Sequence, residues 1–247
     1  GYSLKIIDNQ NNIVWEAKQA ISFCFSKKGK YLAYIQKKEK DSLRLNIIDL
    51  EKKESLLDLN YQKKYKLPVW NDNEEIVAFK HCNDSIKEEE NYLFTTYNFS
   101  SQKQSTYGQK DSAIFNKHAV SAFDELKFSS GKNQILFFGL SDRKNKHKKD
   151  SILKSEKPGL DLWHYKDLKI QPQQISELKW NKGGHIASLN LESDKIYQLS
   201  NDTLKIRISK KNRGKLLLAY NQSPYSIEAQ WRLPWLKDFY IVSATNG

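Results

Sequence analysis

The sequence contains no methionine and only two cysteines, Cys24 and Cys82, among its 247 residues. Two cysteines cannot form a disulfide-rich scaffold, and the C-x-x-C spacing of many zinc sites does not occur. No apolar run approaches the roughly 18 residues that a membrane-spanning helix needs. No secretory signal precedes Gly1, and position 1 is not methionine. We therefore expect a processed or trimmed piece of a longer protein.

Negative charge is scarce relative to positive charge, since 41 Lys and Arg stand against 29 Asp and Glu, a formal net charge of +12. Such an excess suggests a nucleic-acid partner. However, 36 of the 41 basic residues are lysine, whereas base readout favours the bidentate guanidinium of arginine. The lysines are also spread over almost every turn. We expect a general lysine-rich surface and no nucleic-acid partner.

The apolar share of 38% is low, but 13 Tyr, 11 Phe and 6 Trp compensate because each aromatic side chain buries a large area. Apolar residues recur with a period of two, and no segment has the pattern of a three-turn amphipathic helix. The sequence therefore predicts an all-β chain. Nine short strands are expected at 31–35, 43–48, 75–79, 92–97, 134–138, 185–189, 204–208, 215–220 and 239–242.

Four segments share one pattern, in which an aromatic residue precedes a polar turn and a strand. They begin at Phe25, Trp70, Phe128 and Trp180, which lie 45, 58 and 52 residues apart. A four-stranded propeller blade takes about 40–50 residues, and the polar turn suits a tight hairpin between the first two strands of a blade. We therefore predict a β-propeller of four-stranded antiparallel blades, in which these aromatic residues pack between neighbouring blades.

The same strand-then-turn pattern occurs at both ends of the sequence, so the 247 residues are expected to form one propeller domain, complete or partial. A closed propeller has no open edge, and the ring is expected either to be incomplete or to be completed by segments outside the chain. A strongly basic insertion at 141–158 interrupts the third repeat. It is interpreted as a solvated loop, with docking of an anionic partner as the alternative.

Three stretches resemble a known family. The run from Phe25 to Tyr34 resembles the strand-turn signature of TolB-type propeller repeats. The segment 160–174, and Pro224-Tyr225 together with 238–247, resemble the N-terminal propellers of bacterial prolyl oligopeptidase family proteins. The resemblance spans the chain from about Phe25 to Gly247, and it is moderately specific because many propellers share the repeat.

The resemblance implies a role without catalysis. In that family a separate α/β-hydrolase domain carries the nucleophilic serine in a G-x-S-x-G elbow, and this sequence contains no such motif. The propellers sit over the hydrolase active site, restrict entry to short peptides and sometimes contact substrate. The implied partners are therefore a peptide substrate and a hydrolase domain of the parent chain. The resemblance also favours a periplasmic or secreted location.

Two groups of residues are candidates for ligand binding. Trp163, Tyr165 and Asp167 would share one face of a strand, where two aromatic rings and a carboxylate could hold a peptide or sugar. The alternative is that Trp163 packs between blades while Asp167 caps a turn. The amides of 171–174 would extend this site or merely cross a blade edge.

The second group is Tyr225, Trp231, Arg232 and Trp235, which lie in the connection before the last strand. Exposed aromatic residues normally have a functional reason. Packing against a neighbouring blade or an absent domain is one interpretation, and direct ligand contact is the other.

No cofactor or metal site is expected, because the five histidines are scattered and none has a second ligand at metal spacing. Two other functions stay open. One is a stand-alone TolB-type propeller that binds a protein or glycan partner. The other is a propeller enzyme such as a polysaccharide lyase, which would need a His, Asp and Glu cluster in the centre of the ring.

Overall fold

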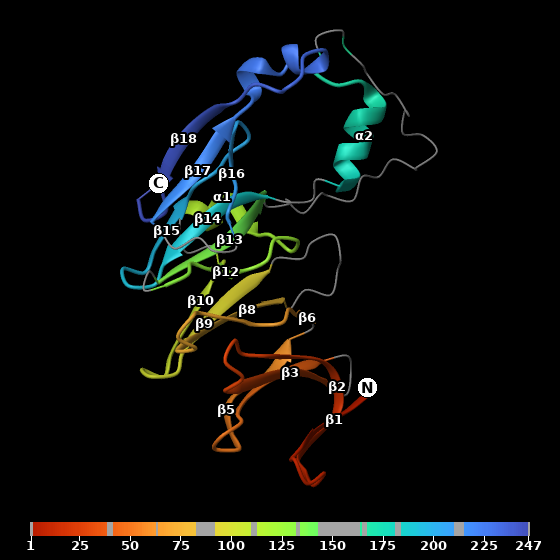
Figure 1. The fold of residues 1–247 in the computed structure, drawn as a ribbon, viewed down its shortest axis with the longest axis vertical. Helices are drawn as coiled ribbons and strands as arrows, with labels where there is room; N and C mark the ends of the chain where they lie inside the picture. Colours follow the sequence, from red (N-terminus) through yellow and green to blue (C-terminus); the bar gives the residue numbers. More distant parts are fainter. Residues whose placement is uncertain are drawn as a thin grey trace.

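The described part of the chain folds into four antiparallel β-sheets that follow one another along an arc, from the N-terminal sheet to the C-terminal sheet (Figure 1). This computed structural model describes residues 2–38, 42–62, 64–82, 92–109, 113–131, 134–142, 164, 167–180, 184–209 and 215–246. The predicted all-β propeller class is confirmed, and a strand lies at each of the nine predicted positions.

The first sheet has the strand order β1-β2-β3-β4-β5. Its strands are β1 (Tyr2–Ile7), β2 (Ile13–Phe25), β3 (Tyr31–Lys37), β4 (Leu43–Asp49) and β5 (Glu54–Gln62). The second sheet has the order β10-β9-β8-β6, with β7 also paired to β8. Its strands are β6 (Lys64–Tyr65), β7 (Val69–Trp70), β8 (Ile76–Cys82), β9 (Leu93–Asn98) and β10 (Lys103–Tyr107).

The third sheet repeats the plan of the second, with the order β11-β13-β14-β15 and with β12 also paired to β13. The fourth has the order β16-β17-β18. These strands are β11 (His118–Val120), β12 (Lys127–Phe128), β13 (Ile135–Asp142), β14 (His185–Asn190), β15 (Lys195–Gln198), β16 (Leu204–Ile206), β17 (Leu216–Asn221) and β18 (Asp238–Ser243). The predicted basic insertion lies outside the described residues from position 143 onward.

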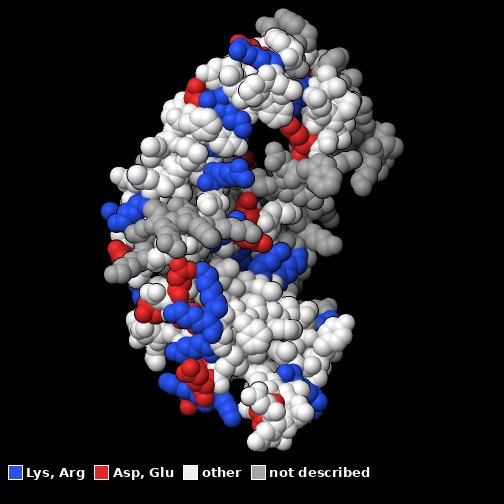
Figure 2. Space-filling view, in the orientation of Figure 1, with Lys and Arg blue, Asp and Glu red and all other residues white. Residues whose placement is uncertain are grey.

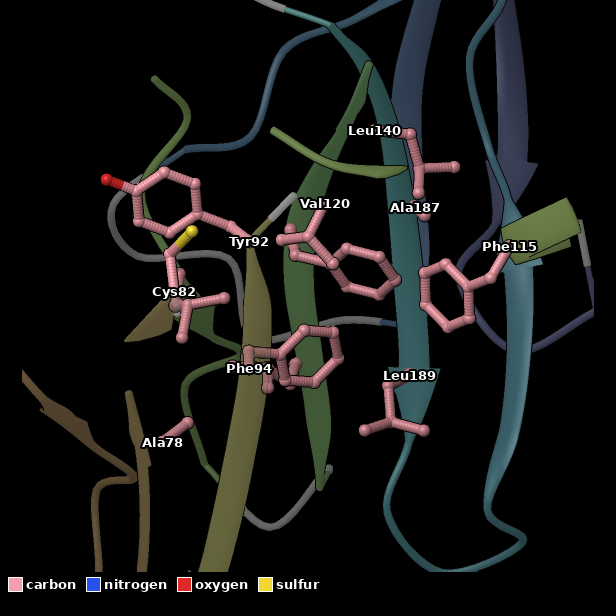
Figure 3. Close-up of a cluster of buried hydrophobic side chains, with 12 residues drawn as sticks. Ala78, Cys82, Tyr92, Phe94, Phe115, Val120, Leu140, Ala187 and Leu189 are labelled. Carbon is pink, nitrogen blue, oxygen red and sulfur yellow. The ribbon is translucent and has the colours of Figure 1, made fainter. Parts of the chain in front are cut away.

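The sheets are held together by apolar clusters between their faces. Strand β8 is buried along its whole length: Val77 and Phe79 pack against the first sheet, whereas Ala78 and Cys82 pack against the third. Strand β13 is divided in the same way, because Phe138 faces the second sheet and Phe137 faces the fourth. The cluster between the second and third sheets is drawn in Figure 3. Each middle sheet is thus apolar on both faces.

Three of the repeated turns share one hydrogen-bond pattern. The residue after the aromatic is Ser26, Asn71 or Ser129, and its side-chain oxygen accepts the backbone N–H of the residue that opens the next strand, at 2.9, 3.0 and 3.3 Å. Trp70 is buried between the first two sheets, whereas Phe25 is 54% exposed on the outer face of the first sheet. The expectation that every such aromatic packs between blades is therefore wrong for Phe25.

The fourth copy of the pattern differs, because Trp180 ends a helix, α2 (Gln171–Trp180), rather than a strand. This helix was not expected, since residues 171–180 have no apolar stripe. Its Gln, Glu, Leu and Lys residues are nevertheless good helix formers, and Pro172 lies in the first turn, where a missing N–H is tolerated. Residues 171–177 are all exposed. A short helix, α1 (Ala113–Lys117), contributes the buried Phe115 to the core.

The burial of both faces of the middle sheets leads to a prediction about stability. Replacing Phe138 by alanine removes a ring that is 2% exposed between the second and third sheets. We expect the free energy of unfolding to fall by about 3–5 kcal/mol. The matched control is Phe23→Ala, because Phe23 is 50% exposed and should lose about 1 kcal/mol or less. Urea unfolding of both variants measures the difference, and equal losses would contradict this packing.

Candidate functional site

Only one residue of the first predicted binding group lies in the described part of the chain. Trp163 and Tyr165 are outside it, and Asp167 is exposed and belongs to no strand. The Asp167 carboxylate accepts the backbone N–H of His164 at 2.9 Å, and its own N–H donates to the His164 carbonyl at 2.9 Å. This carboxylate therefore closes a local turn, and the aromatic shelf stays a prediction.

The second predicted group lies in the connection between β17 and β18, which contains two 3₁₀ turns, η3 (Ser223–Tyr225) and η4 (Glu228–Gln230). Tyr225 donates its hydroxyl to Asp238 Oδ1 at 2.7 Å. The hydrogen bond to this carboxylate raises the pKa of Tyr225 above its ordinary value, because the phenolate would lose the bond and repel Asp238. Tyr225 therefore attaches the connection to the first residue of β18.

The other members of that group are open to solvent. Trp231 is 71% exposed and Trp235 is 56% exposed, and Leu233 between them is 82% exposed. Arg232 forms an ion pair with Glu228 one helical turn earlier, at 3.3 Å. The structure thus brings these aromatic residues together on one exposed connection, although none of them is buried against the described part of the chain.

The connection adjoins a sheet face that is also apolar and exposed. Leu216, Leu218, Phe239 and Ile241 share the outer face of the fourth sheet, since Leu218 pairs with Ile241 in the register of β17 and β18. Their exposed fractions lie between 54% and 75%. The opposite face, with Leu217 and Ala219, is buried against the third sheet. We call Leu216, Leu218, Phe239 and Ile241, with Trp231, Leu233 and Trp235, the terminal apolar surface.

The other end of the arc is covered by the chain itself. The hairpin of β1 and β2 lies over the outer face of β3 and β4, where Leu32, Tyr34 and Ile48 are buried beneath it. Trp15 of β2 packs edge-on against Tyr34, with ring centroids 5.0 Å apart. The terminal apolar surface has no comparable cover among the described residues, so the two ends of the arc differ.

A buried lysine joins the second and third sheets. Lys80 of β8 is 2% exposed, and its Nζ donates to the carbonyl of Ser121 at 2.7 Å and to that of Asp124. Burial lowers the pKa of Lys80 to about 8, and this effect outweighs the nearby carboxylates of Asp124 and Glu125. The sequence gives no signal for this contact, because a lysine in a strand normally faces solvent.

Two contacts of Asp124 hold the loop that accepts the Lys80 hydrogen bonds against the third sheet. The Asp124 carboxylate accepts the backbone N–H of Gly184 at 2.9 Å. It also lies so close to Gly139 that a Cβ there would be 2.2 Å from Asp124 Oδ2. A glycine at position 139 therefore lets the 121–126 loop lie against β13.

The described histidines do not form a metal site. His118 Nδ1 is 3.2 Å from Asp142 Oδ1, and His185 Nε2 is 3.8 Å from Asp202 Oδ1, with the two rings 5.9 Å apart. His81 is buried, where its Nε2 pairs with the Thr95 hydroxyl at 2.9 Å. In the described ranges, no three His, Cys, Asp or Glu side chains are placed to hold an ion. His147 lies outside the described residues.

The charged residues seen on one face of the molecule alternate in sign, with basic groups interspersed among acidic ones (Figure 2).

None of the helices in the described part of the chain has the length and apolar character needed to cross a membrane.

Comparison with known proteins gives structural matches alone. No protein-family model matches the chain, and no curated protein sequence matches it. Similar solved structures include the β-propeller domain of the Trilobed protease from Pyrococcus furiosus, at 12% identity and a TM-score of 0.47, over 99% of this chain and 60% of that chain. A prolyl endopeptidase matches at 11% identity and a TM-score of 0.47, over 92% and 27%. TolB from Acinetobacter baumannii matches at 12% identity and a TM-score of 0.40, over 100% and 47%. The chain thus spans less than two thirds of each of these structures.

Lys80 makes the stability of the chain depend on pH. Its pKa is lowered from 10.5 to about 8 in the folded chain, so between these values the unfolded chain holds a proton that the folded chain has released. The free energy of unfolding must then rise with pH in this window. Relative to Lys80→Met, we expect the native chain to gain about 2 kcal/mol between pH 8 and pH 10.

Urea unfolding of both proteins at several pH values measures this gain. Lys103→Met removes an exposed lysine and serves as the control for the loss of one positive charge. A difference between native chain and Lys80→Met that stays flat or falls with pH would contradict the assignment.

The Tyr225 hydroxyl has a local effect that can be isolated. Tyr225→Phe removes the bond to Asp238 and keeps the ring, so the connection should loosen while the sheets stay folded. We expect trypsin to cleave faster after Arg232, with an unchanged urea midpoint. Tyr2→Phe, at a residue that is 81% exposed, is the control. An unchanged cleavage rate in Tyr225→Phe would show that this bond does not hold the connection.

Proposed function

We propose that this chain is the non-catalytic propeller portion of a prolyl oligopeptidase-like serine peptidase, which gates or helps to bind peptide substrate for a hydrolase domain outside the chain. The sequence resemblance in 160–174 and 238–247 suggests that family. The sequence lacks a G-x-S-x-G elbow, so the chemistry is assigned to the other domain.

The terminal apolar surface is the observation that carries this proposal. Its sheet face has the same alternating apolar pattern that is buried between each of the three pairs of neighbouring sheets. Exposed apolar patches usually mark interaction sites, and here seven large apolar side chains of one sheet and its connection are each more than half exposed. Such a surface suits close packing against another folded body, and the rest of a larger peptidase would supply one.

The shape of the molecule suits a gating role. Strand β2 of the first sheet and strand β6 of the second lie along one side of the arc, and the last strands β5, β10 and β15 of the first three sheets lie along the other (Figure 1). The side with β2 and β6 is hollowed (Figure 2). A body that closes around a hollow admits a thin peptide chain and excludes a folded protein, which is the selectivity that the proposal requires.

The gene that encodes the chain tests the proposal directly. We expect the reading frame beyond the codon for Gly247 to encode a G-x-S-x-G segment within roughly 200 to 300 residues, the size of one further α/β domain. The complete protein should cleave short peptides, and replacing the serine of that motif by alanine should abolish cleavage. A reading frame that stops near Gly247 would refute the proposal and favour a stand-alone propeller that binds a protein or glycan.

A further inference from the structure

The turn that follows β18 begins like the turns that lead to the last strand of each other sheet. In the first three sheets a four-residue turn joins β4 to β5, β9 to β10 and β14 to β15. Strand β18 holds the place of β4, β9 and β14 in the fourth sheet, and a turn begins at the next residue, Ala244. In the described part of the chain, however, β18 pairs with β17 alone.

One backbone hydrogen bond anchors all four turns. The first residue of the turn donates its N–H to the carbonyl of the residue just before β3, β8, β13 or β17. These bonds join Leu50 to Lys30 at 3.0 Å, Phe99 to Glu75 at 2.9 Å, Leu191 to Gln134 at 2.9 Å and Ala244 to Lys215 at 2.6 Å. The turn after β18 therefore starts at the same place relative to its neighbouring strand as the other three turns.

A side chain at the end of the strand also closes each turn. Oδ1 of Asp49, Asn98 or Asn190 accepts the N–H groups of the second and third turn residues at 2.9–3.3 Å. At the same place in the fourth sheet, Ser243 Oγ accepts the N–H of Thr245 at 3.3 Å. Asp, Asn and Ser side chains favour turns through such bonds, so the last residue of β18 starts the same kind of turn.

The fourth residue of each complete turn has a left-handed backbone. Lys53, Gln102 and Asp194 have φ angles of 59°, 52° and 58°, a conformation that glycine adopts without strain and other residues seldom adopt. The sequence has Gly247 at the corresponding position. The residue type that suits this conformation best is therefore present where the fourth turn needs it.

The complete turns also fix the register of the strand that follows. The first residue after each turn pairs with the last residue before it, as in Asp49 with Glu54, Asn98 with Lys103 and Asn190 with Lys195. The same spacing places the residue that follows Gly247 opposite Ser243.

The edge of β18 that faces away from β17 is suited to accept a strand. Natural sheet edges are protected by proline, by lysine or by bulges. Strand β18 contains neither proline nor lysine, and its register with β17 has no shift. The last strands β10 and β15, in contrast, each begin with lysine.

The direction of the backbone groups of β18 follows from its pairing. In an antiparallel sheet, the N–H groups of successive residues point to opposite neighbours. The N–H of Ala244 points to the β17 side, since it donates to Lys215, and those of Val242 and Tyr240 share this direction. The N–H groups that point away from β17 are therefore those of Phe239, Ile241 and Ser243.

We propose that the edge of β18 is completed by an antiparallel strand, formed by the residues that follow Gly247 in the parent chain and paired from Ser243 backwards. This inference deepens the proposed function and rests on it, because it requires the longer chain. It names the element through which the fourth sheet is joined to the rest of the parent protein. A strand at this edge lies beside the terminal apolar surface and leaves its face to the folded partner.

Amide hydrogen exchange measured by NMR tests the added strand. One chain ends at Gly247, and the other carries about ten further residues of the parent, which is enough for one strand. The N–H groups of Phe239, Ile241 and Ser243 should exchange at least about tenfold more slowly in the longer chain, because the added strand supplies their acceptors. The N–H groups of Tyr240 and Val242, which point to β17, should slow less.

Two substitutions of Gly247 in the longer chain test the turn. Gly247→Val introduces a β-branched residue that resists the left-handed conformation. Its three edge amides should therefore exchange about tenfold faster than in the unsubstituted longer chain. Gly247→Asn is the matched control, since asparagine tolerates this conformation, and the edge amides should stay protected.

Equal exchange of the edge amides in the shorter and longer chains, or in Gly247→Val and Gly247→Asn, would overturn the added strand. Protection in the shorter chain that rises with protein concentration would assign the edge to a second copy and would overturn it as well. Protected edge amides in a parent that lacks G-x-S-x-G would refute the peptidase assignment alone. A parent that has this motif but leaves the edge amides unprotected would refute this inference alone.

Discussion

The whole structure depends on the burial of β8 and β13 on both faces. Phe79 and Val77 of β8 pack toward the first sheet while Ala78 packs toward the third, and β13 repeats this division one sheet further on. A sheet with two apolar faces is stable only between two others, so each middle sheet demands neighbours and the sheets stack into an arc. The two end sheets each have an outer face with no neighbouring sheet. In the first sheet the β1–β2 hairpin, with Trp15, covers this face, whereas the outer face of the fourth sheet is exposed among the described residues.

Local patterns made most of this fold predictable. The period-two alternation located nine strands. The turn after the aromatic residue could also be predicted, because it depends on a local hydrogen bond in which Ser26, Asn71 or Ser129 accepts the N–H of the residue that opens the next strand. Helix α2 escaped prediction because its apolar residues form no stripe, although its helix-forming residues are favourable by themselves. The β-bulge between Ala20 and Ser22 of β2 escaped prediction for a different reason. A bulge is a mismatch in length between two paired strands, and the residue count of β2 alone contains no information about its register with β3.

The candidate sites divide in the same way. The density of aromatic residues between positions 225 and 235 was visible in the sequence, because large apolar side chains close to Pro and Arg rarely belong to a core strand. The hydrogen bond by which Tyr225 attaches this connection to Asp238 could not be predicted from the sequence, since it depends on where the connection returns to the sheet. The buried position of Lys80 could not be predicted from the sequence. A lysine within an apolar strand normally marks the solvent face, but β8 has no solvent face, so the ammonium group instead donates to backbone carbonyls of the next sheet.

The outer faces at the two ends of the arc differ, and this difference indicates where a partner can bind. The terminal apolar surface includes a continuous sheet face in which Leu218 and Ile241 are direct cross-strand neighbours, so it can be covered fully only by a broad surface of similar shape. The outer face of the first sheet offers no such surface, because Leu32, Tyr34 and Ile48 lie beneath its own β1–β2 hairpin. One end of the arc is therefore closed by its own chain, whereas the described residues leave the other end open.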